Sequence, residues 1–148
     1  MRPIALVFEA ADDRPLAATV LEPSRVEGAV VISSATGVPR RIYEGVAGCL
    51  ADAGLAVLTF DYRGIGGSRE GGPLRLEPAR MQDWGRLDLE GALRWMRKAY
   101  AGAPLMVLGT AQAVSSSGSP RRRGTSPARR WSARSSAGPG TGRGRRGR

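Results

Sequence analysis

The chain has 148 residues, with 23 Lys and Arg, 13 Asp and Glu, one Cys and no His, and a formal net charge of +10. The absence of histidine excludes Ser-His-Asp and Cys-His nucleophile systems, histidine zinc sites and imidazole general bases. Because Cys49 is the single cysteine, an internal disulfide is excluded as well, and we expect a reducing, cytoplasmic compartment. No signal peptide or membrane-spanning segment is expected.

The charge is unevenly distributed along the chain. Residues 1–110 carry 13 basic and 13 acidic side chains, whereas residues 111–148 carry ten arginines and no acid. The first range alternates apolar runs with turn residues, while the second is rich in Arg, Ser, Gly and Pro. The composition predicts one folded unit over 1–110 and a disordered basic tail over 111–148.

The first elements follow from apolar runs and turn residues. Residues 4–8 and 17–22 flank an acidic segment that contains Pro15, which predicts a hairpin. The continuous apolar run 29–34 predicts a strand covered on both faces.

A helix is predicted over residues 42–53. One helical face holds its apolar residues, namely Ile42, Val46, Cys49, Leu50 and Ala53. Gly54 follows where a helix is expected to end. We therefore expect Cys49 to be a buried small hydrophobic residue rather than a reactive thiol.

The later elements continue this alternation, with strands over 55–60 and 104–108 and a helix over 81–100. The apolar face of that helix comprises Leu89, Ala92, Leu93, Met96 and Tyr100. Trp84 and Trp95 are expected in the core. The order predicts an α/β fold, a mostly parallel sheet with flanking helices. Ligands of such sheets bind at the carboxyl ends of the strands, which the loops 35–39 and 61–68 reach.

Three segments together resemble the amino-terminal half of an α/β-hydrolase of the serine aminopeptidase-like or esterase-like kind. They are residues 30–53, the loop Asp61-Tyr62-Arg63-Gly64-Ile65-Gly66-Gly67-Ser68, and the tryptophan-containing helix that leads to Leu105–Gly109. The resemblance covers about residues 3–109. It implies hydrolysis of an ester, amide or peptide bond of a small molecule through a serine acyl-enzyme, without a cofactor or metal.

The chain departs from that family at its expected nucleophile. There the fifth strand runs into the elbow Gly-x-Ser-x-Gly, but alignment on Gly109 places Ala111 where the serine belongs, and the elbow occurs nowhere. With no nucleophile, acid or histidine in place, we expect this chain to be inactive.

A frameshift explains this departure. Degenerate codons for residues 109–117, read after their first two bases are dropped, can encode His-Ser-Ala-Gly-Gly-Gln-Leu-Leu. We therefore hypothesise a one-base frameshift at Gly109 that replaced the rest of a hydrolase by an out-of-frame translation of GC-rich DNA.

The loop Ala35-Thr36-Gly37 is the candidate oxyanion hole, because the family places one backbone N–H of that hole after this strand. An ordinary strand-to-helix turn is the competing interpretation, with about equal weight. The second donor follows the nucleophile in the family and is missing here.

The family loop contains Asp61, Arg63, Gly64, Gly66 and Ser68. Its Gly-x-Gly continues into Arg69 instead of the third glycine of a dinucleotide fingerprint, so no cofactor is expected. Structural packing, with Asp61 and Arg63 joining neighbouring turns, is the favoured interpretation. The aspartates at 12 and 13 lack the regular spacing of a metal site.

The tail allows a second function. Arg121–Arg123, Arg129–Arg130 and the arginine-glycine run 142–148 resemble segments that bind nucleic-acid backbones by counterion release. Nucleic-acid or other polyanion binding is therefore the alternative hypothesis, and a membrane is not an expected partner.

Overall fold

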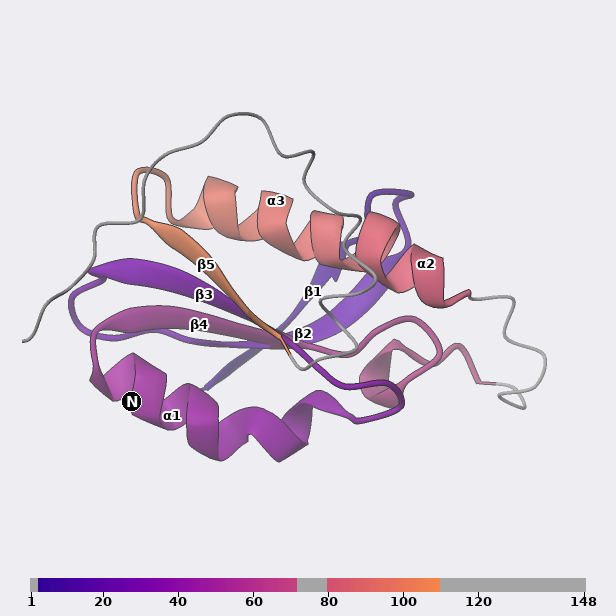
Figure 1. Cartoon of the computed structure of the whole chain (residues 1–148), viewed down its shortest axis with the longest axis horizontal. Helices are drawn as coiled ribbons and strands as arrows, with labels where there is room; N and C mark the ends of the chain where they lie inside the picture. Colours follow the sequence, from indigo (N-terminus) through magenta and orange to yellow (C-terminus); the bar gives the residue numbers. More distant parts are fainter. Residues whose placement is uncertain (1–2, 72–79, 110–148) are drawn as a thin grey trace, which may run out of the picture.

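The computed structural model describes residues 3–71 and 80–109 (Figure 1). The predicted tail and Ala111 lie outside the described residues. Five strands form one sheet: β1 (Ile4–Glu9), β2 (Pro15–Leu21), β3 (Gly28–Ser33), β4 (Leu55–Phe60) and β5 (Leu105–Gly109). The helical elements are η1 (Arg40–Tyr43), α1 (Glu44–Asp52), η2 (Gly66–Ser68), α2 (Met81–Asp83), the π-helix η4 (Trp84–Leu89) and α3 (Glu90–Ala99).

The strands are arranged in the order β1-β2-β4-β3-β5. The hairpin strands β1 and β2 pair antiparallel, and β2 pairs antiparallel with β4. Parallel pairs join β3 to β4 on one side and to β5 on the other. Only β2 therefore runs against the other strands, and the predicted α/β fold with a mostly parallel sheet is confirmed.

Helices cover both faces of the sheet, with α2 and α3 on one side and α1 on the other (Figure 1). Successive residues of a strand point to opposite faces, so Val31 and Leu58 pack toward α3 while Val30 and Val57 pack toward α1. This two-sided burial explains why β3 and β4 are continuous apolar runs rather than alternating ones.

The packing face predicted for the second helix is confirmed, although the helix is divided into α2, η4 and α3. Leu89, Ala92 and Met96 are buried against the sheet. Gly91 permits a close approach to β1, because a Cβ there would lie 2.5 Å from the Glu9 carbonyl oxygen. Trp84 and Trp95 pack against the same core, as predicted.

The face predicted for the first helix is wrong except at Leu50, which packs against the core. Ala47 and Ala51 are the buried residues of α1, whereas Ile42 and Val46 are 64% and 47% exposed, and Cys49 is exposed. Cys49 is therefore not the buried residue that we expected. The helix packs its small side chains on the sheet because alanines allow closer contact than branched residues.

The end of α1 agrees with the sequence. Gly54 has a φ of +89°, the left-handed conformation that favours glycine after a helix. No helix in the described parts of the chain is long and apolar enough to span a membrane.

Candidate functional site

The candidate site lies at the carboxyl ends of the parallel strands β3 and β4. The predicted oxyanion loop leaves β3 in a turn in which the Val38 N–H donates to the Ala35 carbonyl oxygen at 3.0 Å. Gly37 has a φ of +75° at the third position of this turn, which is the reason for a glycine there. Thr36 and Gly37 are exposed at the sheet edge.

The three candidate oxyanion donors are not equivalent. The Ala35 N–H donates to the Tyr43 hydroxyl oxygen at 3.0 Å, so it is already used by η1. No hydrogen bond involves the N–H of Thr36 or Gly37 among residues 3–71 and 80–109. A substrate oxygen would therefore be bound by Thr36 or Gly37, and their role as an oxyanion hole stays a prediction.

Asp61 ends β4 and connects two loops through its buried carboxylate. Its Oδ1 accepts from the Arg40 N–H at 2.6 Å, and its Oδ2 accepts from the Gly67 N–H at 2.9 Å and from the Arg40 guanidinium. The carboxylate thus joins η1 to η2. All of its contacts are structural, as the sequence predicted for Asp61.

Ser68 closes the same loop back onto the sheet. Its hydroxyl donates to the Asp61 carbonyl oxygen at 2.6 Å and accepts from the Ala17 N–H at 2.9 Å. This hydroxyl bridges β2 and the end of β4, next to the bond from the Asp61 N–H to the Ala17 carbonyl oxygen. Ser68 is therefore a buried structural hydroxyl rather than a nucleophile.

Arg63 binds two carboxylates at once. Its Nε donates to Asp88 Oδ1 at 2.8 Å and its backbone N–H to Asp88 Oδ2 at 2.9 Å. Its Nη1 and Nη2 donate to the two Asp12 carboxylate oxygens at 3.0 and 2.8 Å. The guanidinium thereby joins the hairpin turn, the β4 loop and η4, and Arg63 thus makes the kind of contact between neighbouring turns that the sequence suggests for it.

The two carboxyl groups of this network respond in opposite directions. The hydrogen bond from Arg63 holds the pKa of Asp12 below its usual value. Burial raises the pKa of Asp88, and the bonds from Arg63 oppose that rise. Both side chains are occupied by the same guanidinium, so neither is placed to orient a catalytic base.

A chain of aromatic rings lies beneath the family loop. The Tyr62 hydroxyl contacts the Ser33 hydroxyl at 2.5 Å, and the ring stacks on Trp84 with centroids 5.1 Å apart. Burial raises the pKa of Tyr62. These groups pack into the core below the sheet edge, and Gly64, with a φ of +78°, turns the chain above them.

Sequence reasoning missed three residues of this region, Arg40, Tyr43 and Asp88. An aspartate between two leucines, Leu87-Asp88-Leu89, was the available signal for Asp88, because a buried carboxylate requires a cation. No local pattern indicates the partners of Arg40 or Tyr43, because each pairs across a turn or between separate loops. In the described ranges, no group of acidic or cysteine side chains could hold a metal ion.

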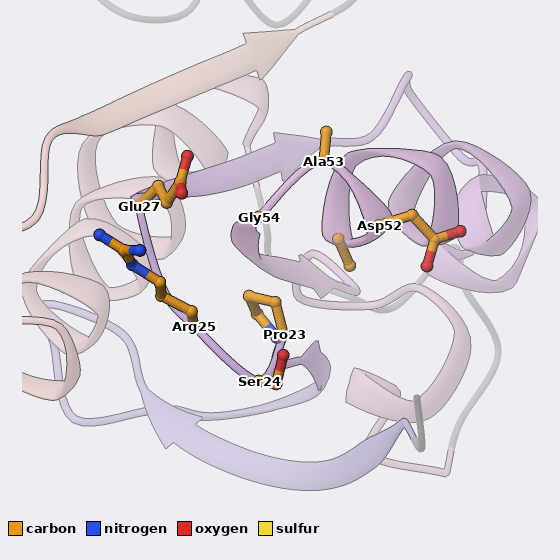
Figure 2. Close-up of a pocket in the computed structure, with 8 residues that line it drawn as sticks. Pro23, Ser24, Arg25, Glu27, Asp52, Ala53 and Gly54 are labelled. Carbon is orange, nitrogen blue, oxygen red and sulfur yellow. The ribbon is translucent and has the colours of Figure 1, made fainter.

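A cavity of about 470 Å³ lies at the opposite edge of the sheet, between the β2–β3 loop and the end of α1 (Figure 2). Arg25 and Asp52 line it, but their charged ends point away from each other in Figure 2. The cavity therefore lacks convergent polar groups of the kind that fix a ligand.

The described residues have an α/β-hydrolase fold, and the candidate site lies at the carboxyl ends of β3 and β4. The chain is similar to an α/β serine hydrolase without a lid from Xanthomonas campestris, with 17% identity, a TM-score of 0.62 and coverage of 79% of this chain and 54% of that one. It is also similar to a thermostable carboxyl esterase from Bacillus coagulans, with 17% identity, a TM-score of 0.61 and coverage of 72% and 36%.

An esterase from Pyrococcus furiosus is similar at 21% identity with a TM-score of 0.60, over 73% of this chain and 41% of that one. The chain thus spans about half or less of the length of these solved structures. No protein-family model matches the chain, and no curated protein does.

Proposed function

We propose that this chain is the amino-terminal part of an α/β serine hydrolase for small ester, amide or peptide substrates, and that it is itself inactive. The fold and its esterase neighbours support the hydrolase part of the proposal. The turn at 35–38 supports it as well, because the backbone N–H groups of Thr36 and Gly37 have no partner among the described residues and could provide one of the two donors of such a site.

One observation carries the inactivity: the sequence has no histidine, and Ala111 occupies the position expected for the nucleophile. Acyl transfer by serine needs a base that removes the hydroxyl proton. Asp61 and Asp88 do not replace this base, because each carboxylate is bound by an arginine.

Activity-based labelling tests this proposal. We expect the purified full chain to show no labelling by a fluorophosphonate probe and no turnover of p-nitrophenyl esters above buffer. A product of the gene corrected by one base at codon 109 is the matched control, and it should be labelled at the restored serine. Specific labelling of one serine in the uncorrected chain would overturn the inactivity.

The frameshift has its own test, which is to sequence the gene. The proposal expects a His-Ser-x-Gly-Gly reading in the alternative frame directly after codon 109. An alternative frame without that reading would refute the frameshift, while the assignment to a hydrolase fold would stand. The cytoplasmic compartment rests on Cys49 alone and stays a prediction.

Polyanion binding is a second candidate, supported only by the ten arginines of residues 111–148. Non-specific phosphate binding is strongly weakened by salt. Affinity for a single-stranded RNA at about 0.15 M salt, measured with the full chain and with a variant whose tail arginines are replaced by glutamine, tests it. Tail-dependent, sequence-selective binding would support this candidate, and loss of binding at that salt concentration would contradict it.

A further inference from the structure

β5 lies at one edge of the sheet, and its apolar side chains are partly exposed. Within the described parts of the chain β5 pairs only with β3. Met106, Val107 and Leu108 are 47%, 49% and 45% exposed, although β3 beside them is buried throughout. Both faces of this strand are therefore open, because Met106 and Leu108 point to the α1 side and Val107 points to the α3 side.

The backbone of β5 is also available for pairing. The Ala29 N–H donates to the Pro104 carbonyl oxygen at 2.8 Å, so the polar groups of residue 104 face β3. Backbone directions alternate along a strand, and those of Leu105, Val107 and Gly109 consequently face outward. They form a row of donors and acceptors at the free edge.

The other edge of the sheet, β1, is better protected against pairing with another strand. A proline precedes each edge strand, Pro3 before β1 and Pro104 before β5, but only β1 ends in an exposed charge, that of Glu9. Charges and prolines are common means by which edge strands avoid pairing. The sequence of β5, Leu-Met-Val-Leu-Gly, has neither, so β5 is the edge that is suited to accept another strand.

The sequence after β5 is poor in apolar side chains. Residues 111–148 contain Val114 and Trp131 as their only large apolar side chains, beside ten arginines. A strand that buries Met106 and Leu108 on one face of the sheet and Val107 on the other needs apolar residues on both of its faces. β5 of a second copy meets that requirement, because it carries the same uncharged pattern.

We propose that β5 pairs antiparallel with β5 of a second copy, in the register that places Val107 opposite Val107. This register turns the outward groups of Leu105, Val107 and Gly109 into about six main-chain hydrogen bonds. It also places Met106 opposite Leu108 on one face, so side chains of similar size meet. The two sheets become one continuous sheet with closed symmetry. The inference is independent of the proposed function.

Sedimentation of the full chain over a range of concentrations tests the dimer, with enough salt to screen the tail charges. We expect a monomer–dimer equilibrium that Val107→Lys weakens by at least about tenfold, because like charges directly opposite each other are destabilising. Val7→Lys is the matched control on β1, where Val7 is 65% exposed, and it should leave the equilibrium unchanged.

Two variants with opposite charges at residue 107 distinguish a loss of strand pairing from a loss of folding. Val107→Lys and Val107→Glu chains should each stay monomeric alone and form a heterodimer when mixed. Circular dichroism of each variant reports whether it folds. An unchanged monomer after mixing folded variants would overturn the proposal.

Cysteine crosslinking tests the register in a Cys49→Ser background, because Cys49 itself is exposed. Met106→Cys mixed with Leu108→Cys should form a disulfide several-fold faster than either variant alone, since opposite residues lie closer than diagonal ones. Equal rates, a monomer at every concentration or only large aggregates would each refute the paired edge.

Discussion

At the residue scale, Gly66 shows how the site loop constrains its sequence. Its φ is +46°, and a Cβ added there would lie 2.5 Å from the Asp61 Oδ2 atom. The loop therefore needs a glycine for two reasons, the left-handed backbone and the contact with the buried carboxylate. Gly66 is one of the glycines of the family loop 61–68, and this packing explains why a glycine stands at that position.

Gly66→Ala should destabilise the fold by about 1–3 kcal/mol, the range for strained backbone positions. The measurement is the free energy of unfolding in urea. Gly45→Ala is the matched control, because Gly45 lies in α1 with open space at its Cβ. That change should stabilise the protein by about 0.5–1 kcal/mol. Equal effects at both positions would contradict this account of the loop.

Asp12 should give the protein a measurable pH dependence. The hydrogen bond from Arg63 lowers the folded pKa of Asp12, so its ionised form stabilises the fold above the unfolded value of about 3.9. This contribution is lost as the pH falls through the lower, folded pKa. Urea unfolding between about pH 6 and pH 3 should show the wild type more stable than Asp12→Asn at the upper end, with the difference shrinking as the pH falls below the unfolded value.

Asp52→Asn is the control for this experiment, because Asp52 is exposed at the end of α1. A difference between wild type and Asp12→Asn that persists unchanged to the lowest pH would contradict the assigned role of the carboxylate.

At the element scale, the two helices differ in how well periodicity predicted their packing. The face of the second helix was correct because Leu89 in η4 and Met96 in α3 are both large and on the stripe that meets the sheet. For the first helix the same reasoning chose Ile42 in η1 and Val46 in α1, which are exposed, over Ala47, which is fully buried. Periodicity identifies a helix. Where a helix has two apolar faces, the space between helix and sheet decides which face is buried.

Ala47→Leu tests the corrected face of α1. The larger side chain has no room between helix and sheet, so we expect a loss of about 1–3 kcal/mol in the free energy of unfolding. Cys49→Leu, the control on the exposed face of the same helix, should change it by less than about 0.5 kcal/mol. A larger effect at Cys49 than at Ala47 would restore the face predicted from the sequence.

At the scale of the whole molecule, β5 is the last strand of the sheet in the part of the chain that the structure describes. On one flank β2 and β1 extend it, while on the other flank Met106 and Leu108 are half exposed. This chain covers 54% and 36% of two solved structures of the same fold. A sheet with one uncovered flank buries less apolar surface. The free energy gained by that burial therefore offsets less of the conformational entropy that the ordered residues lose on folding.

We therefore expect marginal stability, with a free energy of unfolding below about 5 kcal/mol, the lower end for native domains. Thermal unfolding and hydrogen exchange of the full chain measure it. At concentrations at which the chain is a monomer, protected amides should be confined to the central strands β3 and β4. A sharp cooperative transition with protection extending evenly to both sheet edges would contradict this expectation.

The sequence by itself determined the elements, their order, the α/β class and the absence of a histidine base. These depend on local periodicity and on composition, which a single chain displays directly. Only the tertiary structure decided that Arg40 pairs with Asp61, that Arg63 pairs with Asp12 and Asp88, and that α1 packs through its alanines. Such choices depend on which groups distant in sequence become neighbours. They are made by the desolvation of buried charges and by the volume between layers, neither of which leaves a local pattern.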